Sequence, residues 1–339
     1  LQAGTYLVEG SLRFHTSGVV LRGSGIDKTI LRGTGLSRAT LIEINGTDDR
    51  ISGDTISIQT NYVPVNATSF EVANTKGLKE GQELQIIRPS VVPWIQLLKT
   101  DHFGGGITSL GWKPGQRDIR WTRTITAIKG NQLTIDAPLT TALDINYGGG
   151  KIVPFTWKGR ISNCGVEELT LESDFNKANA KDEDHRWMAI TIDDAKDCWV
   201  RRVQFNHFAG SAVAVYENAA RITVEDCIAQ KPVSEIGGER RNVFFTAGQQ
   251  TLFQRCFSEE GIHDFATGFC APGPNAFVQC EAKNAYGFSG GIDSWASGVL
   301  FDIVNVDGNA ISFLNRGQDG QGAGWSTANS VLWNCSAAR

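Results

Sequence analysis

The sequence predicts an all-β chain that folds as a single-stranded right-handed parallel β-helix with an inserted small antiparallel β domain. Three observations support this prediction: a glycine-rich composition, a repeat of short β-rich segments, and a region that interrupts the repeat. The 339 residues include 38 Gly and one Met, which suits many turns better than long helices. Hydrophobic residues make up 41% of the chain and charged residues 20%, so a core can be buried.

The repeat occupies the second half of the chain. Each unit is a short run of mainly β-branched and aromatic residues that ends in a Cys or aliphatic residue before a polar turn. The residues that end these runs are Leu169, Val203, Cys227, Cys256, Cys280, Ile303 and Cys335. Their spacing of roughly 20 to 35 residues is typical of the coils of a β-solenoid with insertions in the turns.

Coils of a β-helix stack about 4.8 Å apart, so equivalent residues of successive coils form ladders. We expect an internal ladder of apolar residues made of Val203, Cys227, Cys256, Cys280 and Ile303. Cys164 and Cys198 lie five residues before two of the run ends and should stack as a second pair. Buried free thiols are favoured here, and a disulfide between neighbouring coils is the alternative.

The first 53 residues show the same pattern of short strands closed by glycine. Ala3-Gly-Thr-Tyr, Val19-Val-Leu-Arg-Gly-Ser-Gly25 and Thr29-Ile-Leu31 resemble the N-terminal coils of pectate-lyase-like parallel β-helix proteins. The resemblance covers residues 1 to about 50 and 155–339, and it is more specific for the fold than for the reaction. It implies a secreted enzyme, extracellular or periplasmic, that acts on polysaccharide as a lyase or a glycoside hydrolase.

Residues 54–150 interrupt the repeat with segments that are typical of antiparallel strands. Lys129-Gly-Asn-Gln between two such segments predicts a hairpin turn. We therefore expect N-terminal coils over 1–53, an inserted β domain over 54–150 and the main coils over 151–339. The segment from Trp94 to Trp121 is rich in Trp, Gly and His. It either holds sugar rings beside a groove or packs the insert on the β-helix.

Charge and apolar patterning argue against several partners. The chain has 32 basic and 36 acidic residues without a basic run, so no nucleic-acid partner is expected. The chain contains no run of about 18 apolar residues, so no membrane span is expected. The seven cysteines include no CxxC, which argues against zinc. Glycosylation sequons at Asn45, Asn66 and Asn334 permit a secreted glycoprotein, and the oligomeric state is left open.

The ends of the chain also carry an expectation. The chain begins without a signal peptide and stops directly after a strand-like segment. We therefore expect a trimmed part of a longer protein.

One face of a parallel β-helix forms a long groove, so candidate site residues are sought as columns at a fixed offset from the run ends. Four residues after the run ends lie His207, Lys231, Glu260, Asn284, Asp307 and Arg339. Eight residues after them lie Ser211, Glu235, Asp264 and Phe288. With Arg240, Arg241 and His263, these residues form the densest ionisable cluster of the chain. Turn positions are polar in any case, so a purely structural column is the alternative.

The cluster suits β-elimination from a uronic acid, which requires a group that neutralises the sugar carboxylate, a base, and an acid for the leaving oxygen. We expect Arg240 or Arg241 to neutralise the carboxylate, and His263 or Lys231 to act as the base. Glu260 and Asp264 complete the predicted catalytic set. Ca²⁺ held by carboxylates could replace the arginine, but without a tight Asp-rich triplet it is weakly supported as a cofactor.

Two alternatives remain open. Hydrolysis or transglycosylation needs two carboxylates that flank the glycosidic bond, and the candidates are Glu235, Glu260, Asp264 and Asp293. A non-catalytic carbohydrate-binding β-helix would need aromatic groove residues without an ionisable cluster. In each case the predicted substrate-binding residues are His207, Glu235, Asn284, Asp293, Trp295, Arg316 and Trp325.

Overall fold

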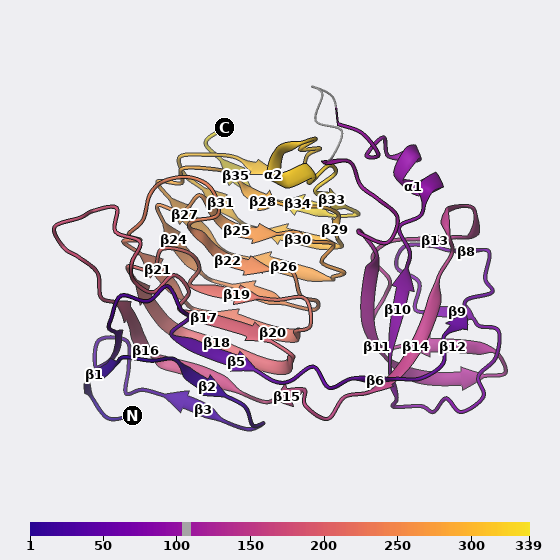
Figure 1. Cartoon of the computed structure of the whole chain (residues 1–339), viewed down its shortest axis with the longest axis horizontal. Helices are drawn as coiled ribbons and strands as arrows, with labels where there is room; N and C mark the ends of the chain where they lie inside the picture. The colour runs from indigo at the N-terminus through magenta and orange to yellow at the C-terminus, as the bar shows by residue number, and fades with distance from the viewer. Residues whose placement is uncertain (104–109) are drawn as a thin grey trace.

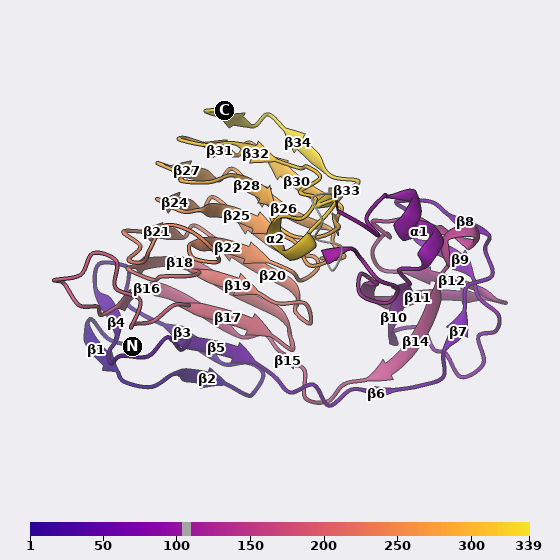
Figure 2. The same ribbon diagram turned by 45° about the horizontal axis from the view of Figure 1, so that its top comes forward.

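The computed structural model describes residues 1–103 and 110–339. It consists of a stacked parallel β-helix and an antiparallel β domain that lies beside it (Figure 1). The two parts are joined by the chain segments around β6 (Ile51–Ser52) and β15 (Ile161–Ser162), at one end of the helix (Figure 2). The architecture confirms the predicted all-β fold, including the insert. No helix in the described part of the chain is both long and apolar enough to cross a membrane.

The β-helix is built from two large parallel sheets and one small one. The first sheet contains β1 (Gly4–Val8), β3 (Val20–Arg22), β4 (Thr29–Gly33), β15 (Ile161–Ser162), β16 (Gly165–Ser173), β18 (Ala195–Asn206), β20 (Ala220–Glu225), β21 (Ile228–Gln230), β23 (Leu252–Gln254), β24 (Phe257–Glu259), β26 (Asn275–Val278), β27 (Glu281–Lys283), β30 (Val299–Asp302), β31 (Asn305–Val306), β34 (Val331–Trp333) and β35 (Ser336–Ala337). The second contains β2 (Leu12–Phe14), β5 (Ile42–Asn45), β17 (Ile190–Asp193), β19 (Val213–Val215), β22 (Asn242–Thr246), β25 (His263–Thr267), β28 (Ser289–Gly291) and β32 (Ile311–Ser312). The small sheet pairs β29 (Ala296–Ser297) with β33 (Thr327–Ala328), and the short helix α2 covers Asp319–Gly322.

The insert is an antiparallel sheet with its own core. Its main sheet contains β6 (Ile51–Ser52), β7 (Ile56–Ser57), β9 (Ser69–Glu71), β10 (Glu83–Arg88), β11 (Ile119–Lys129), β12 (Gln132–Ile135) and β14 (Lys151–Thr156). A second pair joins β8 (Tyr62–Val63) to β13 (Leu143–Asp144), and two short helices cover Val92–Leu97 (α1) and Ile145–Tyr147. The sheet thus begins and ends a few residues outside 54–150.

The internal ladder has the predicted register with one correction. Strand pairing places Val203, Cys227, Cys256 and Cys280 in one column, and it continues to Val304. The prediction of Ile303 is therefore wrong by one residue. Ile303 has a left-handed φ of 56° and is 41% exposed, whereas Val304 is fully buried. The residue before each ladder position forms a left-handed turn in every coil from Arg202 to Asn334, and Ile303 occupies that turn.

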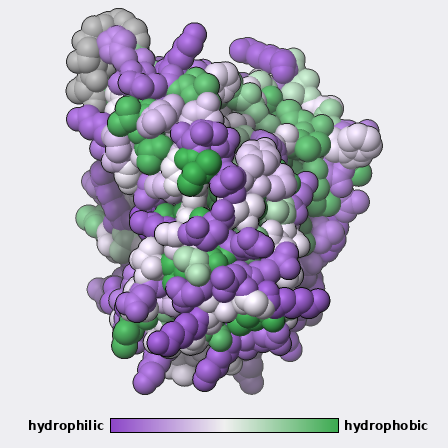
Figure 3. All heavy atoms as spheres, turned by 90° about the vertical axis from the view of Figure 1, so that its right-hand side faces the viewer, coloured by the Kyte–Doolittle hydropathy of each residue, from purple (hydrophilic) through white to green (hydrophobic). Residues whose placement is uncertain are grey.

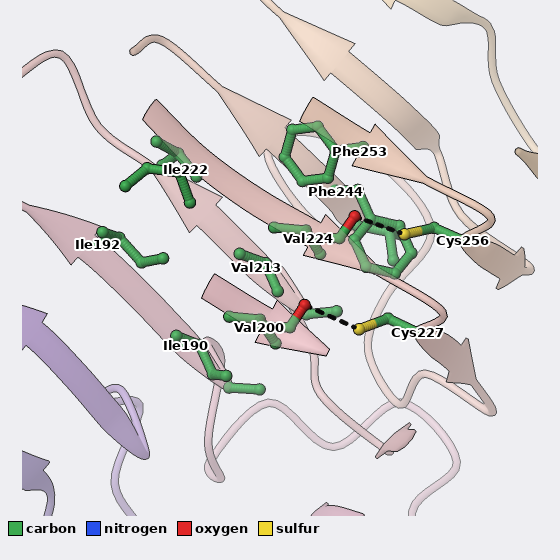
Figure 4. Packing of buried hydrophobic residues seen from close by; sticks show 14 of the residues in the cluster. Ile190, Ile192, Val200, Val213, Ile222, Val224, Cys227, Phe244, Phe253 and Cys256 are labelled. Carbon is green, nitrogen blue, oxygen red and sulfur yellow. Dashed lines mark hydrogen bonds between the residues drawn. The ribbon is translucent and has the colours of Figure 1, made fainter. Parts of the chain in front are cut away.

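Five of the seven cysteines are buried hydrophobic groups in this core: Cys164, Cys198, Cys227, Cys256 and Cys280. Cys164 and Cys198 stack on each other as predicted, because Gly165 pairs with Trp199. All seven cysteines are free thiols. The thiols of Cys227 and Cys256 donate to the carbonyl oxygens of Val200 and Val224 in the preceding coil, at 3.7 and 3.6 Å (Figure 4). The favoured prediction of buried free thiols is therefore confirmed over the disulfide alternative.

A stack of phenylalanines fills the core beside the thiols. The rings of Phe253 and Phe277 are nearly parallel with centroids 4.8 Å apart, and Phe301 continues the stack at 4.7 Å. These three rings are fully buried. Because burying such a side chain contributes roughly 1.5–3 kcal/mol, the repeated aromatic position is a main source of stability for the coils.

Candidate functional site

A cleft of about 870 Å³ lies between the insert and the β-helix. On the helix side it is lined by the turns that follow β5, β19, β22, β25 and β28, so that five of the six coils from β5 to β28 contribute a segment. On the opposite side it is lined by β10, β11, β14 and the loop before β11. Seen from the insert's outer side, hydrophilic residues cover most of the surface and hydrophobic ones form small separate groups (Figure 3).

The lining combines charged and polar side chains with two phenylalanines. The insert contributes Ser52, Gln85, Gln116, Arg117, Asp118, Arg120, Thr122, Val153 and Phe155. The β-helix and its linker contribute Asp48, Arg50, Glu217, Asn218, Ala247, Gln249, Phe269, Cys270, Pro272, Asp293, Ser294 and Gln321. In β11 the side chains alternate, so Arg120 and Thr122 face the cleft while Trp121 and Arg123 are buried.

Trp121 and Arg123 hold the insert against the helix. The indole N–H of Trp121 donates to the carbonyl oxygen of Pro272 at 2.7 Å, and the Arg123 guanidinium donates to that of Gly273 at 3.0 Å. Arg123 also donates to the Gln249 side chain at 2.8 Å. The insert therefore docks on the Ala271-Pro-Gly-Pro-Asn segment of the β-helix.

The tryptophan-rich segment packs the insert rather than lining the cleft. Trp94 and Trp112 are 3% and 2% exposed, and both contact Trp295 of the β-helix, with ring centroids 4.9 and 6.4 Å apart. The packing alternative therefore applies to these residues. Residues 104–109, in the middle of the segment, lie outside the described residues.

One end of the cleft is built around Arg50. Its guanidinium makes a two-pronged contact with Asp48, at 2.7 and 2.6 Å, and donates to the Asn218 side chain at 3.0 Å. It lies over the ring of Trp157, with its central carbon 4.4 Å from the ring centroid. These contacts neutralise Arg50 and fix the wall of the cleft.

Several carboxyl groups lie close together behind the Arg50 end of the cleft. Asn218 also donates to Asp194 at 2.9 Å, and Asp194 lies next to Asp193. Burial, together with the charges of Asp194 and Glu217, raises the pKa of Asp193 to about 6. Asp193 is thus a carboxyl group that takes up a proton at mildly acidic pH, beside the exposed carboxyl group of Glu217.

The other end of the cleft brings the insert loop against two coils. Asp118 accepts hydrogen bonds from the backbone and side chain of Ser90, at 2.8 and 3.0 Å, and pairs with Arg120 at 3.0 Å. Opposite, the Asp293 carboxylate accepts from the backbone N–H and hydroxyl of Ser294, at 2.6 and 2.7 Å. Burial raises the pKa of Cys270 to about 12, so this thiol stays protonated between the two walls.

The predicted column His207, Lys231, Glu260 and Asn284 is a stack of turns. These residues have left-handed φ values of 70°, 54°, 57° and 53°. The ladder position of the next coil is Val304, so the column continues four residues later at Gly308, which has φ 97°. The prediction of Asp307 is therefore wrong by one residue. The polar character of the column matches a backbone requirement, since Gly, Asn and other polar residues tolerate this conformation best.

The other members of the predicted cluster lie in separate surroundings. Arg240 is ion-paired with Glu183 at 2.6 Å, and Glu235 with Lys181 at 2.9 Å. Arg241 is 5% exposed, and its guanidinium donates to the hydroxyl and carbonyl of Ser234, at 2.8 and 3.0 Å. Arg240 and Arg241 therefore do not form a common receptor for one carboxylate.

His263 and Asp264 sit at the start of β25. The His263 Nδ1 contacts the Phe288 carbonyl oxygen at 2.6 Å; since a carbonyl only accepts, Nδ1 carries the proton, and burial lowers the pKa of the ring. Asp264 is fully buried and accepts from the Ser258 hydroxyl at 2.5 Å, while burial raises its pKa to about 6. These contacts fix both side chains in the coil, and their catalytic roles stay predictions.

Asp293 is the one predicted site residue that lines the large cleft. Arg316 lines a separate hollow of about 530 Å³ with His102 and Asp319. Trp325 is 41% exposed and donates from its indole to the Leu98 carbonyl oxygen at 3.1 Å. The predicted binding residues are thus divided among several places.

Apart from Asp293, the residues that line the cleft were not predicted, because the columns were taken from the first sheet. The cleft is lined instead by the turns after the second sheet, where Glu217, Phe269 and Asp293 each lie two residues past a strand end. Aligning runs such as Val213-Ala-Val and Phe265-Ala-Thr would have revealed this column. The insert residues opposite carry no repeat and required the tertiary structure.

No group of three or more His, Cys, Asp or Glu side chains that could hold a metal ion occurs in residues 1–103 and 110–339. Ca²⁺ therefore stays a weakly supported expectation.

Comparisons with known proteins concern the fold. No protein-family model and no curated protein matches the chain. The tailspike protein gp49 of Pseudomonas phage LKA1 matches with a TM-score of 0.54 at 14% identity, covering 99% of this chain and 54% of that one. The Gp54 tailspike of Acinetobacter baumannii bacteriophage AP22, in complex with capsular saccharide, gives 0.40 at 10% identity, covering 93% and 53%. The A-module of Azotobacter vinelandii mannuronan C-5 epimerase AlgE4 gives 0.34 at 10%, covering 99% and 85%.

The chain spans about half the length of the two tailspikes. At 14% identity, the likeness to the LKA1 tailspike shows a shared fold and leaves the activity open. The chain thus has the right-handed parallel β-helix fold that its resemblance to pectate-lyase-like proteins implied.

Proposed function

We propose that this chain is a carbohydrate-active enzyme whose polysaccharide substrate lies along the cleft between the β-helix and the insert. The observation that carries the proposal is the construction of the cleft, because five of the six coils from β5 to β28 supply polar or charged groups to one wall. A polymer of repeating polar units matches a wall that repeats. The phenyl rings of Phe155 and Phe269 add apolar faces on which sugar rings stack.

The reaction that we propose is β-elimination from a uronic acid. Guanidinium groups line both ends of the cleft, and such a group, bound to the sugar carboxylate, makes the neighbouring C–H more acidic. Asp293 offers a carboxylate in the same wall as a base. The roles predicted for Lys231, Arg240, Arg241, Glu260, His263 and Asp264 place the same chemistry on the predicted ionisable cluster instead, and the test below separates the two locations.

Hydrolysis is the second candidate, on a specific observation. Asp193, whose pKa is raised to about 6 mainly by burial, lies near Glu217 at one end of the cleft. A carboxyl group with a raised pKa beside a second carboxyl group is the arrangement that glycosidases use as acid and base or nucleophile.

An extracellular or periplasmic location is part of the proposal, because polymeric polysaccharide is found outside the cell. Of the sequons, Asn66 and Asn334 are exposed, whereas the side-chain oxygen of Asn45 is buried. Asn66 and Asn334 are therefore the better acceptors if the protein is glycosylated.

The test is incubation with a panel of acidic and neutral polysaccharides, followed by ultraviolet absorbance of unsaturated product and by reducing-end release. Absorbance indicates elimination, and reducing ends without absorbance indicate hydrolysis. The Phe269→Ala variant should raise KM about tenfold or more through loss of a stacking face, since base or sugar stacking on an aromatic side chain is worth on the order of 1–3 kcal/mol.

Control variants test whether the catalytic site lies in the cleft. Tyr62→Ala removes an aromatic residue that is 57% exposed on the insert but does not line the cleft, and it should leave KM unchanged. Arg241→Ala and His263→Ala test the predicted ionisable cluster. Loss of turnover in a folded Arg241→Ala or His263→Ala variant, with Phe269→Ala unaffected, would move the site to that cluster. A panel without any product would reject the enzyme proposal.

A further inference from the structure

The cleft is lined by three guanidinium groups, and two of them are already neutralised. Arg50 is paired with Asp48 at 2.6 Å, and Arg120 with Asp118 at 3.0 Å. Within the described residues, Arg117 has no carboxylate at ion-pair distance. The remaining segment, Gly-Gly-Gly-Ile-Thr-Ser at 104–109, contains no carboxylate in its sequence. Arg117 therefore carries a positive charge that no side chain of this protein neutralises by contact.

The position of Arg117 is fixed by its neighbours. Its backbone N–H donates to the Ser90 hydroxyl at 3.1 Å, and the same hydroxyl donates to Asp118 at 3.0 Å. Its guanidinium carbon lies 5.8 Å from the centroid of the Trp112 ring, on the side of the buried tryptophan cluster. A guanidinium held in place loses little entropy when it binds a ligand, which favours tight recognition.

The hydrogen-bonding capacity of Arg117 is largely unused. One Nη1 donates to the Gln116 carbonyl oxygen at 3.3 Å, while Nε is buried and has no partner within the described part of the structure. An unpaired buried donor of a charged group is costly, so an anionic oxygen that reaches it is bound strongly. The geometry of a guanidinium suits a planar carboxylate, which it can contact with two parallel hydrogen bonds.

The opposite wall suits hydroxyl groups rather than a second anion. Arg117 of the insert and Cys270 and Asp293 of the β-helix line the same cleft. Asp293 is an acceptor, with Ser294 as its donor. A ligand at this point therefore presents an anionic group to the insert and hydroxyl groups to the helix, which is the chemistry of an acidic sugar.

We propose that Arg117, which belongs to the insert and not to the β-helix, binds the carboxylate of an acidic sugar residue and makes the cleft selective for anionic polysaccharide. This inference rests on the proposed function, since it assigns the acid-reading group of the same cleft. It makes the insert the specificity element of the protein, while the coils supply the repeating wall.

The experiment compares the binding of uronic-acid oligosaccharides with that of the same oligosaccharides after reduction of their carboxyl groups, by titration calorimetry. Arg117→Gln should weaken binding of the acidic ligand at least about tenfold and change binding of the reduced ligand less than about twofold, as expected for loss of a charged hydrogen bond. Arg117→Lys should lie between, since it keeps the charge without the fork. Arg255→Gln, which removes an arginine that is ion-paired with Asp226 and does not line the cleft, is the matched control and should change neither.

The outcomes separate the inference from the function on which it rests. Equal binding of the acidic ligand by the wild type and Arg117→Gln, with Phe269→Ala weakened, overturns the role of Arg117 and keeps the cleft. Preference of the wild type for the reduced ligand also overturns it. Wild-type protein that binds neither ligand contradicts both proposals. A sulfated oligosaccharide without carboxylates tests whether Arg117 binds a different anion. If this ligand binds more strongly than the uronic-acid oligosaccharide, and Arg117→Gln removes the difference, the assignment to a carboxylate is overturned.

Discussion

At the scale of single residues, burial sets the protonation of two carboxyl groups in this protein. The pKa of Asp193 and that of Asp264 are both raised to about 6, with burial as the largest cause. Asp193 lies beside the cleft, whereas Asp264 is enclosed in a coil with Ser258 and Gly261 as its donors. Its second oxygen, Oδ2, is buried without a partner in the described part of the chain. The two groups thus differ in what they can do, although their pKa values are alike.

Asp264 predicts a pH dependence of stability. Since its pKa is higher in the folded state than the ordinary aspartate value of 3.8, the folded state holds the proton more tightly, and stability is lost as the pH rises from about 3.8 to about 6. The Asp264→Asn variant cannot ionise. Its free energy of unfolding relative to wild type should therefore rise between about pH 4 and about pH 8, by up to about 3 kcal/mol.

Urea unfolding of both proteins at the two pH values measures this difference. Asp193 is present in both proteins, so its own titration cancels. A pH-independent difference between the variant and the wild type would contradict a raised pKa at Asp264. Turnover of the same variant checks the catalytic role predicted for this residue, because a folded and fully active Asp264→Asn enzyme would exclude it.

At the scale of elements, turns with left-handed residues separate the strands of each coil. One such residue precedes each ladder position, and another ends the strands that follow. The same principle operates where the insert docks. Gly273 has φ 59°, and a Cβ at this position would lie 2.1 Å from the Ser297 carbonyl oxygen. Glycine there lets the Pro272 and Gly273 carbonyls reach Trp121 and Arg123.

Gly273→Ala should therefore loosen the attachment of the insert. The left-handed backbone alone costs about 1–2 kcal/mol for a residue with Cβ, and the contact with Ser297 adds to it. Gly317→Ala is the matched control, since Gly317 has φ 56° but open space around its Cβ position. We expect a larger loss of unfolding free energy for Gly273→Ala than for Gly317→Ala, together with weaker saccharide binding. Equal losses would show that the contact with Ser297 is relieved without effect.

At the scale of the whole molecule, the cleft follows the axis of the β-helix. The turns after β5 and β28 lie at its two ends, five strand spacings apart in the second sheet. At about 4.8 Å a step, the wall extends for about 24 Å. The insert covers this length from one side and is joined to the helix near one end (Figures 1 and 2).

The length of the wall predicts how affinity depends on oligosaccharide length. Binding should strengthen with each added sugar until the oligosaccharide spans about 24 Å, and then stay constant. Calorimetric titration with a size-graded series of one oligosaccharide measures this dependence. An affinity that is already constant from the disaccharide onward would indicate a single small subsite instead of an extended cleft.

The sequence by itself determined the β-helix, the insert and the thiol ladder, because these features depend on local propensity and on a repeat that a single chain displays. Its one error in the ladder, Ile303 for Val304, arose because a β-branched residue occupies a left-handed turn. The cleft was decided by the tertiary structure alone. Arg117 and Asp293 are far apart in the chain, and only the docking of the insert on Pro272 and Gly273 brings their walls together. Contacts between elements without a common repeat leave no periodic signal, so the sequence could place Asp293 near a groove but could not identify what faces it.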